Sequence, residues 1–319
     1  MPGSYAHMTM VGKAREKREL IQIDGFPREG IEAAGVYLNF LTLGAVSPDY
    51  PYLDLTSLRS KKWADAMHYT HTGDTVVAGC DIVKKLSAGE DKQKCLAWLM
   101  GYAAHVVGDM CIHPVVELKV GPYEGYPTEH RKCEMNQDAY IFPTLGLGMP
   151  QDAAEFVKAT ILSCSMIDNP NVLFSGVKNV WEELLRSVHP ALFEQDPPIL
   201  DRWHHTCYSI LVKALGTTSR LVPWARHVCD NAGLVYPETD KIDMQYSVGL
   251  RVPSPAGTEQ RMDYDEIFTF AIGEVRKAWR GVVRHSLGIE DMGEFRGGEW
   301  NLDTGRDTAA DNKFVFWEA

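Results

Sequence analysis

Residues 95–116 read CLAWLMGYAAHVVGDMCIHPVV, the most apolar stretch of the chain, and its only formal charge is Asp109. A stretch of this length and composition is long enough to cross a membrane. However, His105 and His113 flank Asp109 on either side, and Pro114 follows directly. Ionisable side chains in a bilayer core are costly. The pattern therefore predicts a long helix that is buried inside the protein and does not span a membrane.

The same stretch places three metal-ligand side chains on one helix face. His105, Asp109 and His113 recur at every fourth position, so on an α-helix they lie one turn above another. His130 and Glu134 repeat this spacing on the next predicted helix. A buried carboxylate needs a cation or a dense shell of hydrogen bonds. Imidazole nitrogens and carboxylate oxygens together suit zinc, so the two pairs predict a metal site between two helices.

Other metal-site motifs do not occur in the sequence. Di-iron carboxylate bundles use a paired Glu-x-x-His motif, and many metalloproteases use His-Glu-x-x-His. Neither pattern occurs here, and the adjacent His-Asp pair of one large phosphohydrolase class is also missing. The sequence therefore does not indicate a member of these three classes.

Helical periodicity also dominates the rest of the chain and predicts an all-α fold. The predicted helices cover residues 29–44, 74–87, 91–113, 128–141, 151–167, 176–188, 198–215 and 262–286. Alternation between Met244 and Val252 predicts one strand or an extended flap. We expect a metal-site region at residues 1–175, a helical C-terminal part at 176–290 packed on it as one domain, and a tail at 291–319.

The predicted tail carries a regular series of carboxylates. Asp303, Asp307 and Asp311 recur at every fourth position in a Gly- and Asp-rich segment. This spacing differs from that of an EF-hand loop. We therefore interpret the segment as a solvated surface tail and not as a calcium site.

Charge and composition restrict the function classes. The 319 residues carry a formal net charge of −11, which argues against a protein that holds duplex DNA or docks tightly on anionic membranes. The seven cysteines are odd in number and contain no Cys-x-x-Cys pair, which excludes a zinc ribbon and a thioredoxin-like motif. The N-terminal residues contain no apolar segment of a secretory signal, so we expect a reduced, cytoplasmic protein.

Further candidate ligands precede the apolar stretch. Pro48 ends a predicted helix, and Asp49 follows in the turn, where its carboxylate can point toward a common centre. His68 and His71 add one or two imidazoles, and the sequence leaves open which of them is the ligand.

In their order along the chain, these motifs resemble the zinc-dependent phospholipase C family. The resemblance covers residues 1 to about 140 and rests on His7, Gly44-Ala-x-x-Pro48-Asp49, Met67-His68-Tyr69, Gly101-Tyr-x-x-His105-x-x-x-Asp109-x-x-x-His113-Pro114 and His130-x-x-x-Glu134. That family shares an all-helical fold and a three-zinc site with the single-strand-specific fungal nucleases. The resemblance therefore implies an all-α bundle with a helical C-terminal extension.

The resemblance also implies a role for each candidate ligand. One zinc would be surrounded by Asp49, His68, His105 and Asp109. Asp109 would bridge to a second zinc, which His7 would also hold, and the third would be held by His113, His130 and Glu134. The implied cofactor is zinc, with two or three ions per chain.

Two features depart from the family pattern. In the secreted members an N-terminal Trp gives its amine and carbonyl to zinc, whereas here His7 follows Met1 closely and no Trp precedes it. The interval from Asp109 to His113 is a single helical turn, shorter than in some members.

The implied activity is hydrolysis of a phosphodiester. Zinc lowers the pKa of water and neutralises phosphate charge during in-line attack, and the resemblance gives Asp49 the catalytic role of orienting that water or accepting its proton. A phospholipid headgroup is one candidate substrate. Aromatic residues near the ligands could form a cation–π cage, a stacking wall or ordinary packing; they are Tyr50, Tyr52, Trp63, Tyr69, Tyr123 and Tyr126.

Two alternatives stay open at this point. The protein could be a phosphodiesterase of the single-strand nuclease type, or a catalytically inert interaction module that metal ions stabilise. The sequence leaves the oligomeric state undecided.

Overall fold

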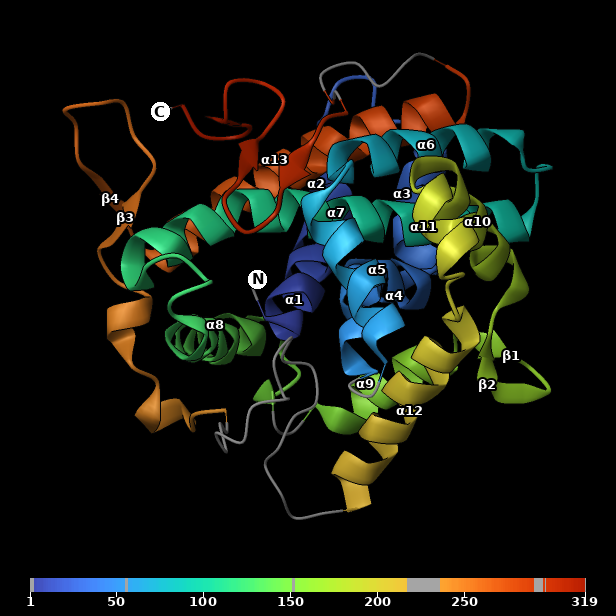
Figure 1. Ribbon diagram of the computed structural model, residues 1–319, viewed down its shortest axis with the longest axis horizontal. Coiled ribbons are helices and arrows are strands. Elements are labelled where there is room, and N and C mark those ends of the chain that lie inside the picture. The colour runs from blue at the N-terminus through green and yellow to red at the C-terminus, as the bar shows by residue number, and fades with distance from the viewer. Residues whose placement is uncertain are drawn as a thin grey trace.

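The computed structural model describes residues 3–54, 57–150, 153–216, 236–289, 295 and 297–318. Helices form most of its secondary structure, which confirms the predicted all-α class (Figure 1). The α-helices are α1 (Ser4–Ala14), α2 (Lys17–Leu20), α3 (Arg28–Val36), α4 (Leu38–Val46), α5 (Leu58–Tyr69), α6 (Thr72–Lys85), α7 (Glu90–Val120), α8 (Pro127–Ile141), α9 (Ala154–Leu162), α10 (Ser175–Val188), α11 (Pro190–Gln195), α12 (Leu200–Gly216) and α13 (Tyr264–Ser286).

Short 3-10 helices and strands connect these helices. The 3-10 helices are η1 (Ser47–Leu53), η2 (Phe142–Leu145), η4 (Thr239–Lys241) and η5 (Met244–Tyr246). The strands are β1 (Ser165–Met166), β2 (Asn169–Leu173), β3 (Leu250–Val252), β4 (Gln260–Met262), β5 (Trp300–Asn301), β6 (Arg306–Asp307) and β7 (Lys313–Phe314). All of the strand pairs are antiparallel and lie at the periphery of the bundle.

The central element is α7, which runs through the middle of the molecule (Figure 1). Every residue from Cys95 to Val116 is buried, and α4 and α13 pack along its length. Among the described residues, one helix, α7, is long and apolar enough to cross a membrane. Its apolar stretch is entirely buried inside the protein. A helix that is apolar on all sides is typical of a protein core, as predicted from the sequence.

The α4 and α7 backbones touch where they cross. A Cβ atom added to Gly44 would lie 1.9 Å from the carbonyl oxygen of Trp98, and one added to Gly101 would lie 2.0 Å from the carbonyl oxygen of Leu41. Only glycine fits such contacts, because the neighbouring atoms belong to backbone and cannot rotate away. Since α4 leads directly into η1, this crossing places Asp49 next to α7.

Several predicted boundaries differ from the structure. The predicted helix 29–44 is two helices, because the backbone of Tyr37 (φ −107°, ψ 47°) is not helical. The central helix continues through Pro114 to Val120 instead of ending at residue 113. The predicted helix 151–167 ends at Leu162, where the β1–β2 hairpin follows. Helices α1, α2, α5 and α11 were not predicted.

The C-terminal segment, residues 297–318, is not the solvated tail that we expected. Trp300 is 3% exposed and Leu302 is fully buried, and β5, β6 and β7 form a small antiparallel sheet. The segment lies across α7 and α13 (Figure 1), where the Trp317 ring packs on Phe270 of α13 at 4.4 Å. The predicted strand at 244–252 is shorter, because only β3 pairs with β4. The division of the chain at residues 175 and 290 stays a prediction.

Candidate metal centre

Five predicted ligands meet in the interior of the bundle. They come from α1, η1, α5 and α7, and each residue is at most 5% exposed: His7, Asp49, His68, His105 and Asp109. Four separate elements therefore converge on one buried, polar point in an apolar core.

Asp109 lies between two imidazoles. Its Oδ1 is 3.1 Å from Nε2 of His7, and its Oδ2 is 3.4 Å from Nε2 of His105, one helical turn earlier. The rings of His7 and His105 stack with their centroids 4.1 Å apart. One carboxylate thus presents a separate oxygen to each of two histidines, which is the arrangement expected of a ligand that bridges two metal ions.

A second group of ligand atoms shares His105 with the first. Nε2 of His68 lies 3.4 Å from Oδ1 of Asp49 and 3.4 Å from Nε2 of His105. Asp49, His68 and His105 form one compact group, and His7, His105 and Asp109 form the other.

The distances in these groups are compatible with a shared cation. Two ligand atoms on a tetrahedral zinc, at bond lengths of about 2.0–2.1 Å, lie about 3.3–3.4 Å apart. The buried pairs lie 3.1–3.4 Å apart. Surface imidazole–carboxylate pairs of this protein range from 2.6 Å, between His71 and Glu299, to 3.3 Å, between His71 and Asp74.

Unsatisfied polar atoms provide an independent test of the fit. Among the described residues, no hydrogen-bond partner faces either ring nitrogen of His7, either carboxylate oxygen of Asp109, or Oδ1 of Asp49. Buried polar groups in native proteins nearly always have partners. Because these orphaned atoms converge on each other, the residues present fit zinc.

Backbone carbonyls hold the histidine rings in the tautomer that zinc needs. Nδ1–H of His68 donates to the carbonyl oxygen of Ala64 at 2.6 Å, and Nδ1–H of His105 donates to that of Ala45 at 2.9 Å. Both bonds leave Nε2 deprotonated and pointing into the centre. This carbonyl–histidine contact is the usual outer-shell support of a metal ligand.

Burial favours the neutral imidazole of His7, whereas at His105 the carboxylates of Asp109 and Asp49 outweigh burial and raise the pKa. Burial lowers the pKa of His7 to about 4. Burial opposes the charged form of Asp109, but the charges of His105 and His113 outweigh it and hold the pKa of Asp109 well below its usual value. His7 and Asp109 are therefore in their metal-binding protonation states at neutral pH.

A comparison with known protein families agrees with this geometry. The model of a family described as zinc dependent phospholipase C matches residues 6–191, more than half of the chain. The chain belongs to the zinc-dependent phospholipase C family. The matched region contains all eight predicted ligands and ends before α12, α13 and the C-terminal segment. No curated protein and no solved structure matches the chain significantly.

The remaining predicted ligands of the chain lie beside this centre. His113, His130 and Glu134 are 1%, 2% and 8% exposed. Nε2–H of His130 donates to the carbonyl oxygen of Gly121 at 2.6 Å, which leaves Nδ1 as its ligand atom. Among the residues that the structure describes, these three do not form a group as compact as the first two. Their role as a third zinc site stays a prediction.

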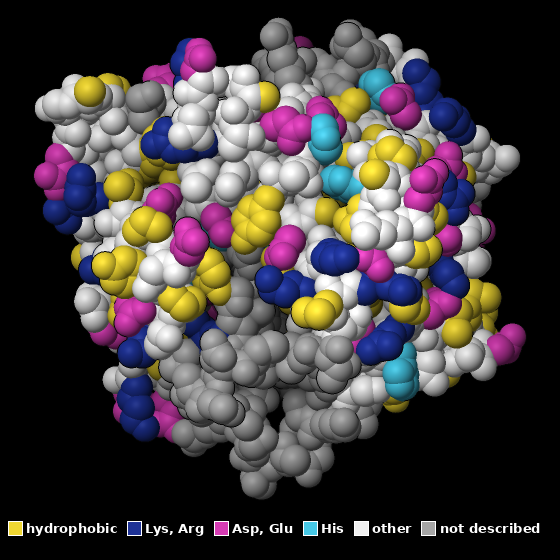
Figure 2. Space-filling model, viewed as in Figure 1, with side chains coloured by type: hydrophobic (Ala, Val, Ile, Leu, Met, Phe, Trp, Pro, Cys, Tyr) yellow, Lys and Arg dark blue, Asp and Glu magenta, His cyan; other side chains and the backbone are white. Residues whose placement is uncertain are grey.

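The choice between the two upstream histidines follows from their positions. His68 points into the centre, whereas the His71 ring is 46% exposed and pairs with Glu299 and Asp74. Figure 2 shows histidines beside acidic side chains near the start of α6, where His71 and Asp74 lie. His71 is therefore not at the predicted centre.

Two residues near the centre were missed by the sequence analysis. Asp138 continues the four-residue series of His130 and Glu134 on α8, a signal that was available. Its Oδ1 accepts the backbone N–H of Ala6 at 2.7 Å, and its Oδ2 accepts the hydroxyl of Tyr236 at 2.7 Å. Asp138 thereby fixes the start of α1, which carries His7. The second residue, Asp303, lies in the C-terminal segment.

Proposed function

We propose that this protein is a zinc-dependent phosphodiesterase of the phospholipase C type, which hydrolyses a phosphodiester such as a phospholipid headgroup. The observation that carries the proposal is the position of Asp109, whose two oxygens face different histidines in a fully buried cluster. Zinc, when bound, supplies a nucleophile at neutral pH and neutralises the charge of the phosphate oxygens. Two ions side by side suit in-line displacement at phosphorus.

The five residues of the centre have different roles in binding zinc and in moving the proton of the attacking water. His7, His68 and His105 would hold zinc through their Nε2 atoms, and Asp109 would offer both of its carboxylate oxygens. Asp49 is 5% exposed, whereas the other four ligands are at most 1% exposed. Asp49 therefore lies nearest to arriving substrate and water. Its carboxylate orients the attacking water and accepts the proton that the water loses.

Aromatic side chains beside the ligands support a headgroup site. The Tyr52 ring lies 5.4 Å from that of His68, and the Tyr123 ring lies 5.3 Å from that of His130. Such rings can contact a quaternary ammonium group through cation–π interactions. Tyr50 and Trp63 are fully buried, so they belong to the core and not to a headgroup cage.

The charge of the visible surface agrees with a small substrate. Figure 2 shows Lys and Arg interspersed with Asp and Glu over the face viewed. The described side chains on this face form no continuous basic track of the kind that duplex DNA would need.

A substrate panel tests the proposal. The zinc-loaded protein is offered a chromogenic choline phosphodiester, phosphatidylcholine vesicles and single-stranded DNA, with Asp49→Asn and Asp311→Asn as variants. We expect hydrolysis of the choline esters, a loss of about 10²–10⁴-fold in Asp49→Asn because the proton acceptor is gone, and no change in Asp311→Asn, whose side chain is 87% exposed.

The other outcomes of this panel identify the alternatives. Cleavage of single-stranded DNA alone would show a nuclease. Bound zinc without turnover on any of the three substrates would show an inert, metal-stabilised module. Either result would overturn the proposed phospholipase C activity.

A further inference from the structure

The C-terminal segment, residues 297–318, is fixed against the metal centre although it lies outside the region that the family model matches. The backbone N–H of Leu302 donates to the carbonyl oxygen of the ligand His68 at 2.9 Å. The indole N–H of Trp317 donates to the carbonyl oxygen of Cys111 on α7 at 2.9 Å. This segment thus contacts two of the elements that supply central ligands, α5 and α7.

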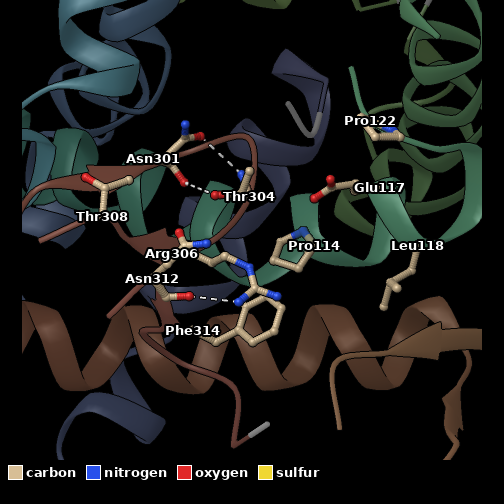
Figure 3. A pocket seen from close by; sticks show the side chains of 10 residues that line it. All are labelled: Pro114, Glu117, Leu118, Pro122, Asn301, Thr304, Arg306, Thr308, Asn312 and Phe314. Carbon is tan, nitrogen blue, oxygen red and sulfur yellow. Dashed lines mark hydrogen bonds between the residues drawn. The ribbon is translucent and has the colours of Figure 1, made fainter. Parts of the chain in front are cut away.

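A glycine brings the turn of this segment into contact with α7. Gly305 has a φ of +68°, and a Cβ atom there would lie 2.3 Å from Cγ of Pro114 and 2.6 Å from the carbonyl oxygen of Met110. Any other residue would push the turn away from the helix. Further along, α7 and the segment enclose a pocket of about 460 Å³ (Figure 3). The turn around residues 301–305 is therefore seated at the end of α7 that carries His113.

Asp303 lies at the tip of this seated turn. The hydroxyl of Tyr69, next to the ligand His68, donates to its Oδ2 at 2.8 Å. The turn itself is held by the side-chain oxygen of Asn301, which accepts the backbone N–H groups of Asp303 and Thr304 at 2.9 and 3.2 Å. These contacts direct the other oxygen of Asp303, Oδ1, to within 3.5 Å of Nδ1 of His113.

The 3.5 Å between Nδ1 of His113 and Oδ1 of Asp303 is close to the 3.4 Å between His105 and Asp109 in the central groups. It is longer than two surface imidazole–carboxylate contacts, at 2.6 and 2.7 Å, and close to a third, between His71 and Asp74 at 3.3 Å. Within the described part of the chain, neither ring nitrogen of His113 has a hydrogen-bond partner, although the side chain is buried. His113 and Asp303 therefore have the spacing of two ligands of one ion.

The charge of Asp303 also acts on the other predicted ligands of the third ion. It raises the pKa values of His113 and His130, against the larger lowering effect of burial, and it adds to the effect of burial in raising the pKa of Glu134. The carboxylate of Asp303 thus favours the charged form of both imidazoles and disfavours that of Glu134.

We propose that Asp303 is a zinc ligand that completes the third metal position together with His113, His130 and Glu134. This inference rests on the zinc centre proposed above. Four protein ligands make a closed tetrahedral site, which is typical of structural zinc, whereas sites that act on substrate keep a position open. The third ion then ties the C-terminal segment to the bundle, and the chemistry belongs to the pair of ions around Asp109.

The test measures metal binding directly. Wild type, Asp303→Asn, Tyr69→Phe and Asp311→Asn are compared by zinc content per chain, by titration calorimetry with zinc, and by the visible absorption of the cobalt-substituted proteins. Asp303→Asn should weaken one binding site at least about tenfold and change the cobalt spectrum. Asp311→Asn makes the same charge change in the same segment and should leave both unchanged. Tyr69→Phe removes a hydrogen bond but keeps the carboxylate, and it should retain all the zinc of wild type.

Each contrary result has a distinct meaning. If Asp303→Asn binds zinc as wild type does, with an unchanged cobalt spectrum, Asp303 is not a ligand and only this inference fails. If Tyr69→Phe or Asp311→Asn loses the same ion, the effect is one of segment packing or charge, and the inference is also overturned. If wild type itself binds no zinc, the proposed function fails first. Melting curves of the chelated variants show whether each substitution leaves the fold intact.

Discussion

Removing zinc is expected to lower the melting temperature by an amount that the structure allows us to calculate. In the absence of metal, the orphaned atoms of His7, Asp49 and Asp109 face each other in a dry core. Each bound ion stabilises the folded state by about 4 kcal/mol when free zinc is a thousand times its Kd. At about 2.1 cal/mol/K per residue, the 319 residues give an entropy of unfolding of about 0.67 kcal/mol/K. Each ion therefore raises Tm by about 6 °C, and two ions raise it by about 12 °C.

Differential scanning calorimetry measures this shift. Chelated wild type should melt about 12 °C or more below the zinc-loaded protein, and returning zinc should restore the original curve. Asp109→Asn provides the matched control, because the bridging charge is lost while the size of the side chain is kept. Its shift on chelation should be about 12 °C smaller than that of wild type, because the two ions of the Asp109 centre are already lost. Superimposable wild-type curves, with zinc loss verified by elemental analysis, would refute the reasoning.

Three other predictions follow from the same geometry. Asp109→Asn should lose zinc and activity, whereas His71→Ala, on the surface, should keep both; elemental analysis and turnover would show equal effects if the centre were misassigned. Burial lowers the pKa of His204 to about 4, below the value of about 6.5 in the unfolded chain. The unfolded chain therefore binds more protons, and the free energy of unfolding falls as the pH drops from about 6.5 to 4, by at most about 1.4 kcal/mol per pH unit. Denaturant titrations of His204→Gln should show a weaker pH dependence than those of wild type or His205→Gln, and equal slopes would contradict the assignment. Gly44→Ala puts a Cβ atom 1.9 Å from the carbonyl oxygen of Trp98 and should lower the free energy of unfolding by about 1–3 kcal/mol or more. Gly35→Ala, whose Cβ atom has nothing within 4 Å, should be neutral or stabilising. The midpoints of urea unfolding of the two variants test this difference.

The sequence was sufficient to predict the parts of the site that local geometry determines. His105, Asp109 and His113 had to share a face, because four-residue spacing on a helix leaves no other arrangement. Asp49 could be inferred because Pro48 ends a helix just before it. These predictions depend only on the backbone within a few residues, so they required no knowledge of the tertiary fold.

Contacts between distant segments could not be predicted in this way. Asp303 reaches His113 from a turn that Gly305 seats on α7, and nothing within the segment itself indicates that contact. Trp300 and Leu302 are apolar residues within a Gly- and Asp-rich segment, and they were better indicators of burial than the polar composition of the segment. The choice of His68 over His71 also needed the fold, since it depends on the carbonyl of Ala64 and on the left-handed backbone of His71 (φ 53°).

The glycine contact between α4 and α7 has a consequence for metal selectivity. The carbonyl oxygen of Ala45, one residue after Gly44, accepts the Nδ1–H of His105, so the helix separation also sets where that ring stands relative to Asp49. Backbone already in contact cannot move closer, and separating it would break this bond. The centre therefore has a fixed size, which suits metal–ligand bonds of about 2.0–2.1 Å. Calcium needs six to eight oxygen ligands at about 2.3–2.6 Å, so both the rigidity of the centre and its nitrogen ligands exclude calcium. If calcium displaced zinc at similar concentrations in a competition titration, the α4–α7 crossing would have to widen. If zinc were retained in a large excess of calcium, Gly44 and Gly101, far from any substrate, would discriminate between ions by their radius.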